Sequence, residues 1–132
     1  MQISETTYTS EVLEVHEFEF GTFYYFQNFV LAEISEGINF DWPKAKIILD
    51  IANRIYPINF KPHYISNKIN SYSIDPTIWL RVFKTKRRIN TYVVIDSNPS
   101  ARFNLLFEKQ FFKGKIRKFD TLYEAIYWAE EN

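Results

Sequence analysis

The stretch Thr91–Asp96 reads TYVVID, a continuous run of aromatic and β-branched residues. Such a run is typical of a strand that is buried on both faces, as in a parallel sheet. Helix signals stand on both sides of it along the chain. Asp75-Pro76 places a capping residue before a proline that suits the first turn of a helix, and Asn98-Pro99 does the same after the strand. A buried strand between two helices predicts an α/β fold with a parallel core.

The remaining segments extend this alternation in both directions. Residues 11–20 alternate acidic and apolar positions, as a half-buried strand does, and a change of phase at His16-Glu17 indicates a bulge or break. Two β-rich runs, 22–26 and 29–34, flank a tight turn at Gln27-Asn28. The further elements are expected to be a helix at 42–56 capped by Asp41, a strand at 63–66, a polar loop at 67–74, helices from 75 and from 98 to 113, a strand at 116–119 and a helix that begins at 121.

Two of the predicted helices carry a further signal. The helix after residue 98 has an apolar stripe, which consists of Phe103, Leu106, Phe107, Gln110 and Phe111. The sequence Thr121-Leu-Tyr-Glu124 is a capping box, which fixes the start of the helix that follows it.

The 132 residues are expected to form a single domain in which residues 1–10 are frayed. Because strands alternate with helices, we expect a mixed, mostly parallel sheet with an N-terminal antiparallel hairpin and about four helices. The composition, 46% hydrophobic and 19% aromatic, supplies a core and excludes a disordered chain.

Three segments resemble the STAS domain, and more closely the SpoIIAA-like bacterial proteins. Residues 30–41 are similar to that family's second strand, which leads through a glycine to an Asp-capped helix. Residues 91–107 resemble its strand–Asn/Pro/Ser–helix unit, and residues 119–126 its closing strand and helix. The resemblance implies a STAS-type α/β sandwich. It also implies a non-enzymatic regulatory role, because a partner kinase phosphorylates the antagonist members on a serine of an Asp-Ser-Ser-Gly motif.

The segment that corresponds to this motif, residues 66–76, contains serines near a helix start but no Asp-Ser-Ser-Gly. The resemblance therefore assigns no phosphorylated serine in this chain.

Several classes of protein are excluded by what the sequence lacks. The absence of cysteine excludes disulfides, thiolate zinc sites and cysteine nucleophiles. The N-terminus has no signal-peptide pattern, and no apolar stretch approaches the ~20 residues of a membrane helix. We therefore expect a cytoplasmic protein. All sixteen Lys and Arg lie within residues 42–118, while residues 1–41 carry only acids; this asymmetry is interpreted either as opposed charged faces or as segments that neutralise each other on folding.

No catalytic or metal-binding motif stands out. His16 and His63, the two histidines, lie in separate predicted strands and lack the spacing of a zinc site. The three glycines are isolated, which excludes a nucleophile elbow and the glycine-rich phosphate loops. We therefore expect no enzyme activity, no metal and no cofactor.

Polar residues gather where two predicted strands end. In an alternating α/β sheet, ligands bind beyond the carboxyl ends of the strands. The candidates for partner binding or phosphorylation are Ser66, Asn67, Asn70, Ser71, Ser73, Asp96, Ser97 and Asn98. Ordinary turn and capping chemistry is the alternative interpretation, since it favours the same residue types. The favoured function is a non-enzymatic regulatory or protein-interaction module whose partner is a protein such as a kinase-like regulator.

Two patterns suggest other partners. Residues 81–88 contain five bases with an interleaved aromatic residue, as nucleic-acid surfaces do, but a net charge of zero argues against a nucleic acid. The four consecutive aromatics of residues 23–26 place two rings on each face of a strand. These rings need a helix, a second copy of the chain or a ligand to cover them. The alternative function is therefore a carrier of a small apolar ligand or lipid in an aromatic-lined cavity.

Overall fold

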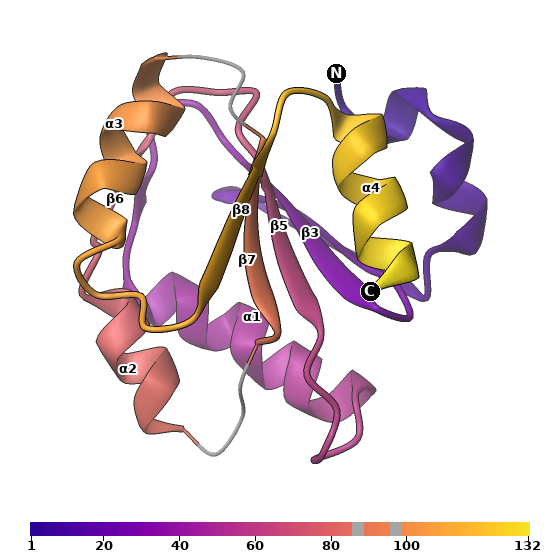
Figure 1. Cartoon of the computed structure of the whole chain (residues 1–132), viewed down its shortest axis with the longest axis horizontal. Helices are drawn as coiled ribbons and strands as arrows, with labels where there is room; N and C mark the ends of the chain where they lie inside the picture. Colours follow the sequence, from indigo (N-terminus) through magenta and orange to yellow (C-terminus); the bar gives the residue numbers. More distant parts are fainter. Residues whose placement is uncertain (86–88, 96–98) are drawn as a thin grey trace.

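A computed structural model describes residues 1–85, 89–95 and 99–132 and shows an α/β fold (Figure 1). The strands are β1 (Glu14–Phe18), β2 (Gly21–Tyr25), β3 (Phe29–Ile34), β4 (Asn39–Phe40), β5 (His63–Asn67), β6 (Ser73–Ile74), β7 (Thr91–Ile95) and β8 (Lys115–Phe119). The α-helices are α1 (Trp42–Ile55), α2 (Ile78–Lys84), α3 (Pro99–Glu108) and α4 (Leu122–Glu131), and two 3₁₀ helices, Ile3–Glu5 and Thr7–Glu11, precede β1. None of the helices in these ranges is long and apolar enough to cross a membrane.

Six strands form one mixed sheet in the order β1-β2-β3-β5-β7-β8. The first three are antiparallel neighbours, whereas β3, β5, β7 and β8 run parallel. In this register Ser66 of β5 lies between Ala32 of β3 and Val94 of β7. The short strands β4 and β6 form a separate parallel pair. The prediction of an α/β fold with a mixed sheet, antiparallel N-terminal strands and four helices is thus confirmed within the described ranges.

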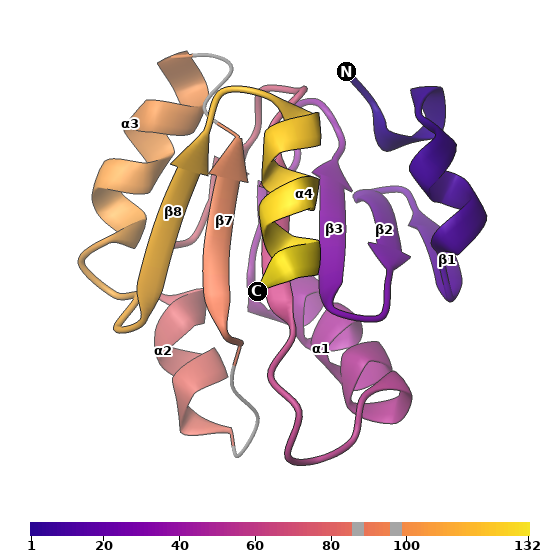
Figure 2. The same cartoon turned by 45° about the vertical axis from the view of Figure 1, so that its right-hand side comes forward.

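Helices cover both faces of the sheet (Figures 1 and 2). The α1 face is covered by α1, α2 and α3, and the α4 face by α4 and the 3₁₀ helices. Because side chains alternate along a strand, Tyr92 and Val94 of β7 enter the core of the α1 face. Val93 and Ile95 enter the core of the α4 face. The strand is therefore buried on both faces, as its sequence predicts.

The starts of α1 and α4 follow from local sequence. Pro43 lies in the first turn of α1, where a missing N–H costs no helical hydrogen bond. The side chain of Asp41 makes no capping bond there and pairs instead with Lys44, 3.2 Å away. At α4 the hydroxyl of Thr121 accepts from the backbone N–H of Glu124 at 3.2 Å, which is the predicted cap.

The N-terminal part differs from its sequence-based prediction in two ways. Residues 1–10 were expected to fray, yet they contain the two 3₁₀ helices, and Ile3 is fully buried. Residues 11–20 contain β1 and a reversal after Phe18; the predicted bulge or break at His16-Glu17 is wrong, because β1 pairs with β2 continuously through these residues. Gly21 makes this reversal possible: its φ is +153°, and a Cβ there would lie 2.8 Å from the carbonyl oxygen of Glu33.

The third helix presents a different face from the one its apolar stripe suggests. The side chains of Phe103 and Leu106 are each 63% exposed, and that of Phe107 is 47% exposed. The helix instead turns Leu105 and Glu108 toward the sheet, where both are buried. The apolar stripe predicted the wrong buried face of α3, because Glu108 is held in the core by polar contacts although glutamate is normally found at the surface.

Candidate functional site: an aromatic cavity with a polar end

A cavity of about 90 Å³ lies between the α1 face of the sheet and helices α1 and α2. Its walls are largely apolar and aromatic: Ile48 comes from α1, Trp79 from α2, and Tyr64 and Tyr92 from the sheet. One ordered water needs roughly 10–15 Å³, whereas pockets for drug-sized ligands begin near about 300 Å³. The cavity therefore suits a compact ligand.

Short side chains create this space. Ala45 and Ala52 lie two turns apart on α1 and thus on the same side of the helix, and both line the cavity. Ser66 lines it from β5. Larger residues at these positions would fill the gap between helix and sheet, as they do in a close-packed interior.

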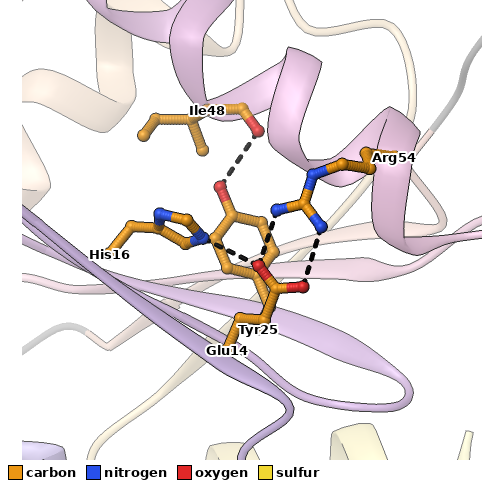
Figure 3. Close-up of polar contacts among 5 residues, drawn as sticks. All are labelled: Glu14, His16, Tyr25, Ile48 and Arg54. Atoms are coloured by element: carbon orange, nitrogen blue, oxygen red, sulfur yellow. Dashed lines mark hydrogen bonds and ion pairs between the residues drawn. The ribbon is translucent and has the colours of Figure 1, made fainter.

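Two tyrosine hydroxyls fix α1 over the sheet. The hydroxyl of Tyr25, on β2, donates to the carbonyl oxygen of Ile48 in α1 at 3.0 Å (Figure 3). The hydroxyl of Tyr56, which follows α1, donates to the carbonyl oxygen of Phe26, with that of Phe29 also within reach at 3.1 Å. Both tyrosines are buried, so their hydroxyls need these partners. The two bonds tie the helix to strands β2 and β3 and help to keep the cavity from collapsing.

The rim of the cavity reaches solvent. Leu49 of α1, Phe60 in the loop that follows it, and Ile89 all line the cavity and are half-buried. A ligand can therefore approach over apolar side chains, without prior unfolding of a core strand.

Three residues with hydroxyl groups, Tyr64, Ser66 and Tyr72, line the cavity, and we call them its polar end. The hydroxyls of Ser66 and Tyr72 are 3.2 Å apart and share one hydrogen bond. The hydroxyl of Tyr64 has no hydrogen-bond partner in the described part of the chain. Burial is the main cause that raises the pKa of Tyr64 well above its usual value, so this hydroxyl keeps its proton at neutral pH.

A buried ion pair lies behind this polar end. The ammonium of Lys68 donates to the hydroxyl of Tyr72 at 3.0 Å and lies 3.8 Å from Oε2 of Glu108. Oε1 of Glu108 accepts from the indole N–H of Trp79 at 3.0 Å and from the hydroxyl of Tyr92 at 2.7 Å. The exposed fraction is 1% for Lys68 and 0% for Glu108.

Burial alone would lower the pKa of Lys68, but Tyr72 and Glu108 outweigh that effect and raise it. Lys68 is therefore charged, and Glu108 supplies a carboxylate to balance it. Trp79 and Tyr92 satisfy Oε1 of Glu108, whereas Oε2 has no hydrogen-bond partner among the described residues and has the ammonium of Lys68 as its counter-charge. The hydroxyls that line the cavity can donate hydrogen bonds to a bound molecule.

A second cluster of titratable groups lies at the surface, between β1 and α1 (Figure 3). The guanidinium of Arg54 donates two hydrogen bonds to the carboxylate of Glu14, at 2.6 and 2.9 Å, and Nε2 of His16 lies 2.9 Å from the same carboxylate. These contacts, with Arg54 first, lower the pKa of Glu14 to about 2. A carboxylate that is this acidic is a poor base. The cluster ties β1 to the end of α1, and its residues do not line the cavity.

The structure places the candidate residues from the sequence in different environments, some buried and some exposed. Ser66 and Asn67 are both buried; the amide of Asn67 donates to Glu33 at 2.8 Å. Asn70 is half-buried and donates to the carbonyl of Ile34 at 2.9 Å, whereas Ser71 and Ser73 are exposed. Three further candidates, Asp96, Ser97 and Asn98, lie outside the described residues. Only Ser71 and Ser73 therefore present an exposed side chain among the candidates described, and only Ser66 lines the cavity.

The sequence did not reveal the residues that give the cavity its polar end. Lys68 and Glu108 are far apart in the sequence and are charged types that are normally exposed. Tyr64 and Tyr72 do not stand out among the nine tyrosines of the chain. One signal was available: Leu105, Glu108 and Phe112 lie at helical spacing, and a second apolar face with a single glutamate in it could have pointed to Glu108.

In the described ranges, no group of three or more His, Cys, Asp or Glu side chains could hold a metal ion. Comparisons with known proteins return no matching family model, no significantly similar curated protein and no significantly similar solved structure.

Proposed function

We propose that this protein binds a small, largely apolar ligand in the cavity between α1, α2 and the sheet. One observation carries the proposal: an aromatic-lined space with a solvent-reaching rim remains on the α1 face of the sheet. A cavity of this size in a core costs stability unless something fills it. Ligand binding would offset that cost.

The proposal does not include a chemical transformation of the ligand. The hydroxyls of Tyr64, Ser66 and Tyr72 line the cavity, with the ammonium of Lys68 behind Tyr72, and these groups can orient a bound molecule by hydrogen bonds. This supports a carrier or sensor of a small molecule.

Filling the cavity tests the proposal. Isothermal titration calorimetry with cumene (isopropylbenzene) as the probe is expected to show saturable binding to the unaltered protein. Ala52→Leu should weaken that binding at least about ten-fold, because the added side chain occupies the ligand's space. Ile47→Ala is the matched control on the same helix, since Ile47 is exposed and does not line the cavity.

Circular dichroism would show that Ala52→Leu still folds, and Ala45→Leu provides a second filling variant. Binding that is equally tight in the filled and unaltered proteins, or no binding either of cumene or of an oxygen-bearing analogue of the same size, would refute a ligand site here.

A second function, a non-enzymatic protein-interaction module of STAS type, is supported by a different feature. Phe103, Leu106 and Phe107 form an exposed apolar patch on α3. The side chain of Asn104 donates to the carbonyl of Tyr72 at 3.1 Å, which places α3 beside the segment that carries the exposed Ser71. An apolar patch next to a modifiable serine suits a regulated protein contact.

This function is tested by affinity purification of the tagged protein from its own cells. A protein that co-purifies should be lost from Phe103→Ser and changed in amount in the double variant Ser71→Ala with Ser73→Ala. Tyr127→Ser, an equally exposed aromatic position on α4, is the control. If all variants retain the same co-purifying proteins, the patch and the serines are not a docking site.

A further inference from the structure

The polar end of the cavity contains hydroxyl protons for which the described residues supply no acceptor. Ser66 and Tyr72 have two hydroxyl protons between them, and their mutual hydrogen bond uses one. The oxygen of Tyr72 also accepts from Lys68 at 3.0 Å, so it is already an acceptor. Whichever hydroxyl donates in the mutual bond, the other keeps a proton that has no acceptor in the described ranges. The hydroxyl of Tyr64 adds a second such proton.

The protein cannot satisfy these donors from its own apolar walls. Ser66 and Tyr72 are buried, and Tyr64 lines the same cavity between Trp79 and Tyr92, with ring centroids 6.1 and 5.9 Å away. A buried donor without an acceptor destabilises the empty site, so at the buried Ser66–Tyr72 pair a bound molecule that brings an acceptor oxygen gains more than its apolar contacts alone provide.

The charges near the polar end determine whether a neutral or a charged ligand oxygen binds there more favourably. The positive charge of Lys68 lies behind Tyr72 and is paired with the carboxylate of Glu108. The hydroxyls that line the cavity are neutral. Burial of a carboxylate beside a pair that is already balanced would leave a net negative charge in a low-dielectric site, which is costly. A neutral carbonyl, ester or hydroxyl oxygen accepts the same hydrogen bonds without that cost.

We propose that the ligand is a compact neutral molecule with an apolar body and a single hydrogen-bond-accepting oxygen, which the hydroxyls of Tyr64 and of the Ser66–Tyr72 pair bind at the end of the cavity. This inference rests on the proposed ligand-binding function and specifies its chemistry. The aromatic walls contact the apolar body of the ligand, and the two donors orient its oxygen away from the rim.

Three probes of nearly equal size separate the possibilities: acetophenone has a neutral acceptor oxygen, benzoate has a charged one, and cumene has none. Calorimetry at pH 7.5 is expected to show that benzoate binds at least about ten-fold more weakly than acetophenone. Tyr64→Phe should weaken acetophenone about five-fold and leave cumene unchanged, since only the hydrogen bond is removed. Ser66→Ala should act in the same direction. Tyr127→Phe, the same chemical change at an exposed position on α4, is the matched control.

The outcomes distinguish the two proposals. If cumene binds and acetophenone is unaffected by Tyr64→Phe and Ser66→Ala, the ligand site stands and the inference about its polar end is overturned. Benzoate that binds as tightly as acetophenone also overturns it. If neither cumene nor acetophenone binds to the unaltered protein, the ligand-binding function fails, and the inference fails with it.

Discussion

Neighbouring residues of the same strands point to opposite faces of the sheet, and the two faces differ in what they contain. On the α4 face, Leu31, Ile65, Val93, Ile126 and Ala129 are all fully buried, in one cluster with the rings of Phe26 and Phe29. The α1 face combines a larger number of aromatic rings with a buried ion pair, and it borders the cavity. Both faces contain rings and alanines, so residue type alone does not decide which face keeps a space. The two faces differ in the buried ion pair and in the cavity, which depend on how the helices lie over the sheet.

The largest expected effect concerns the ion pair under the α1 face. Lys68→Met should lower the free energy of unfolding by about 3–5 kcal/mol, because it leaves the carboxylate of Glu108 buried without its counter-charge. Urea unfolding would measure the change, and Lys109→Met at an exposed site is the control. Adding Glu108→Gln to Lys68→Met should recover part of the loss. An unchanged urea midpoint in Lys68→Met would show that the pair does not support this face.

A smaller effect compares one type of substitution on the two faces. Ala129→Leu should cost about 1–3 kcal/mol, because Ala129 is fully buried in the cluster of the α4 face and the added atoms must displace its neighbours. Ala52→Leu should cost less than half as much or stabilise the protein, since the cavity accepts the side chain. Thermal unfolding of both variants would measure the difference. Equal costs would mean that the two faces are packed alike.

The smallest expected effect concerns the carboxylates that tie outer segments to each face. Glu14, with a pKa lowered to about 2 by Arg54, contributes stability that is present above its ordinary pKa of 4.5 and is lost as the pH falls toward 2. Glu14→Gln should therefore be slightly less stable than the unaltered protein at pH 7, and the difference should vanish at low pH.

The contribution of Glu33, on the α4 face, to stability should change with pH in the opposite direction. Burial is the main cause that raises its pKa, so its ionised form costs stability at neutral pH and protonation relieves that cost as the pH falls. In Glu33→Gln, the amide oxygen can still accept from Ile3 and Asn67, which both donate to one oxygen of Glu33 at 2.8 Å. This variant should be more stable at pH 7, with a gap that narrows toward pH 4.5. Urea midpoints measured as a function of pH test both carboxylates. If the curve of either variant runs parallel to that of the unaltered protein, the pKa shift assigned to that carboxylate is contradicted.

Sequence patterns predicted the elements well where a local cause sets them. The run Thr91–Ile95 is a strand buried on both faces, and Thr121 caps α4 as its capping box predicts. The four consecutive aromatics also alternate as expected, since Phe23 and Tyr25 lie in the core of the α1 face and Phe26 in that of the α4 face. Period and capping are properties of neighbouring residues, so they can be read without the fold.

The cavity and its polar end depend on contacts between distant residues and could not be predicted. Ala45 and Ala52 leave space only because α1 packs over Ser66 and the rings of β5 and β7. The same limit explains the error at α3, where the apolar stripe with Phe103 predicted the buried face. The contact of Glu108 with Trp79 and Tyr92 decides which side of that helix faces the sheet.

The segments that close the α4 face come from opposite ends of the described chain. Ile3 and α4 meet on that face, with strands β3, β5 and β7 between them in sequence. The helices and strands of the α1 face are complete by β8, before α4 is synthesised. During translation the α4 face of the sheet therefore stays uncovered until residues 122–131 have left the ribosome. The nascent chain exposes the apolar side chains of this face for longer than those of the α1 face. A chaperone that recognises aliphatic residues would meet this protein at that side of the sheet.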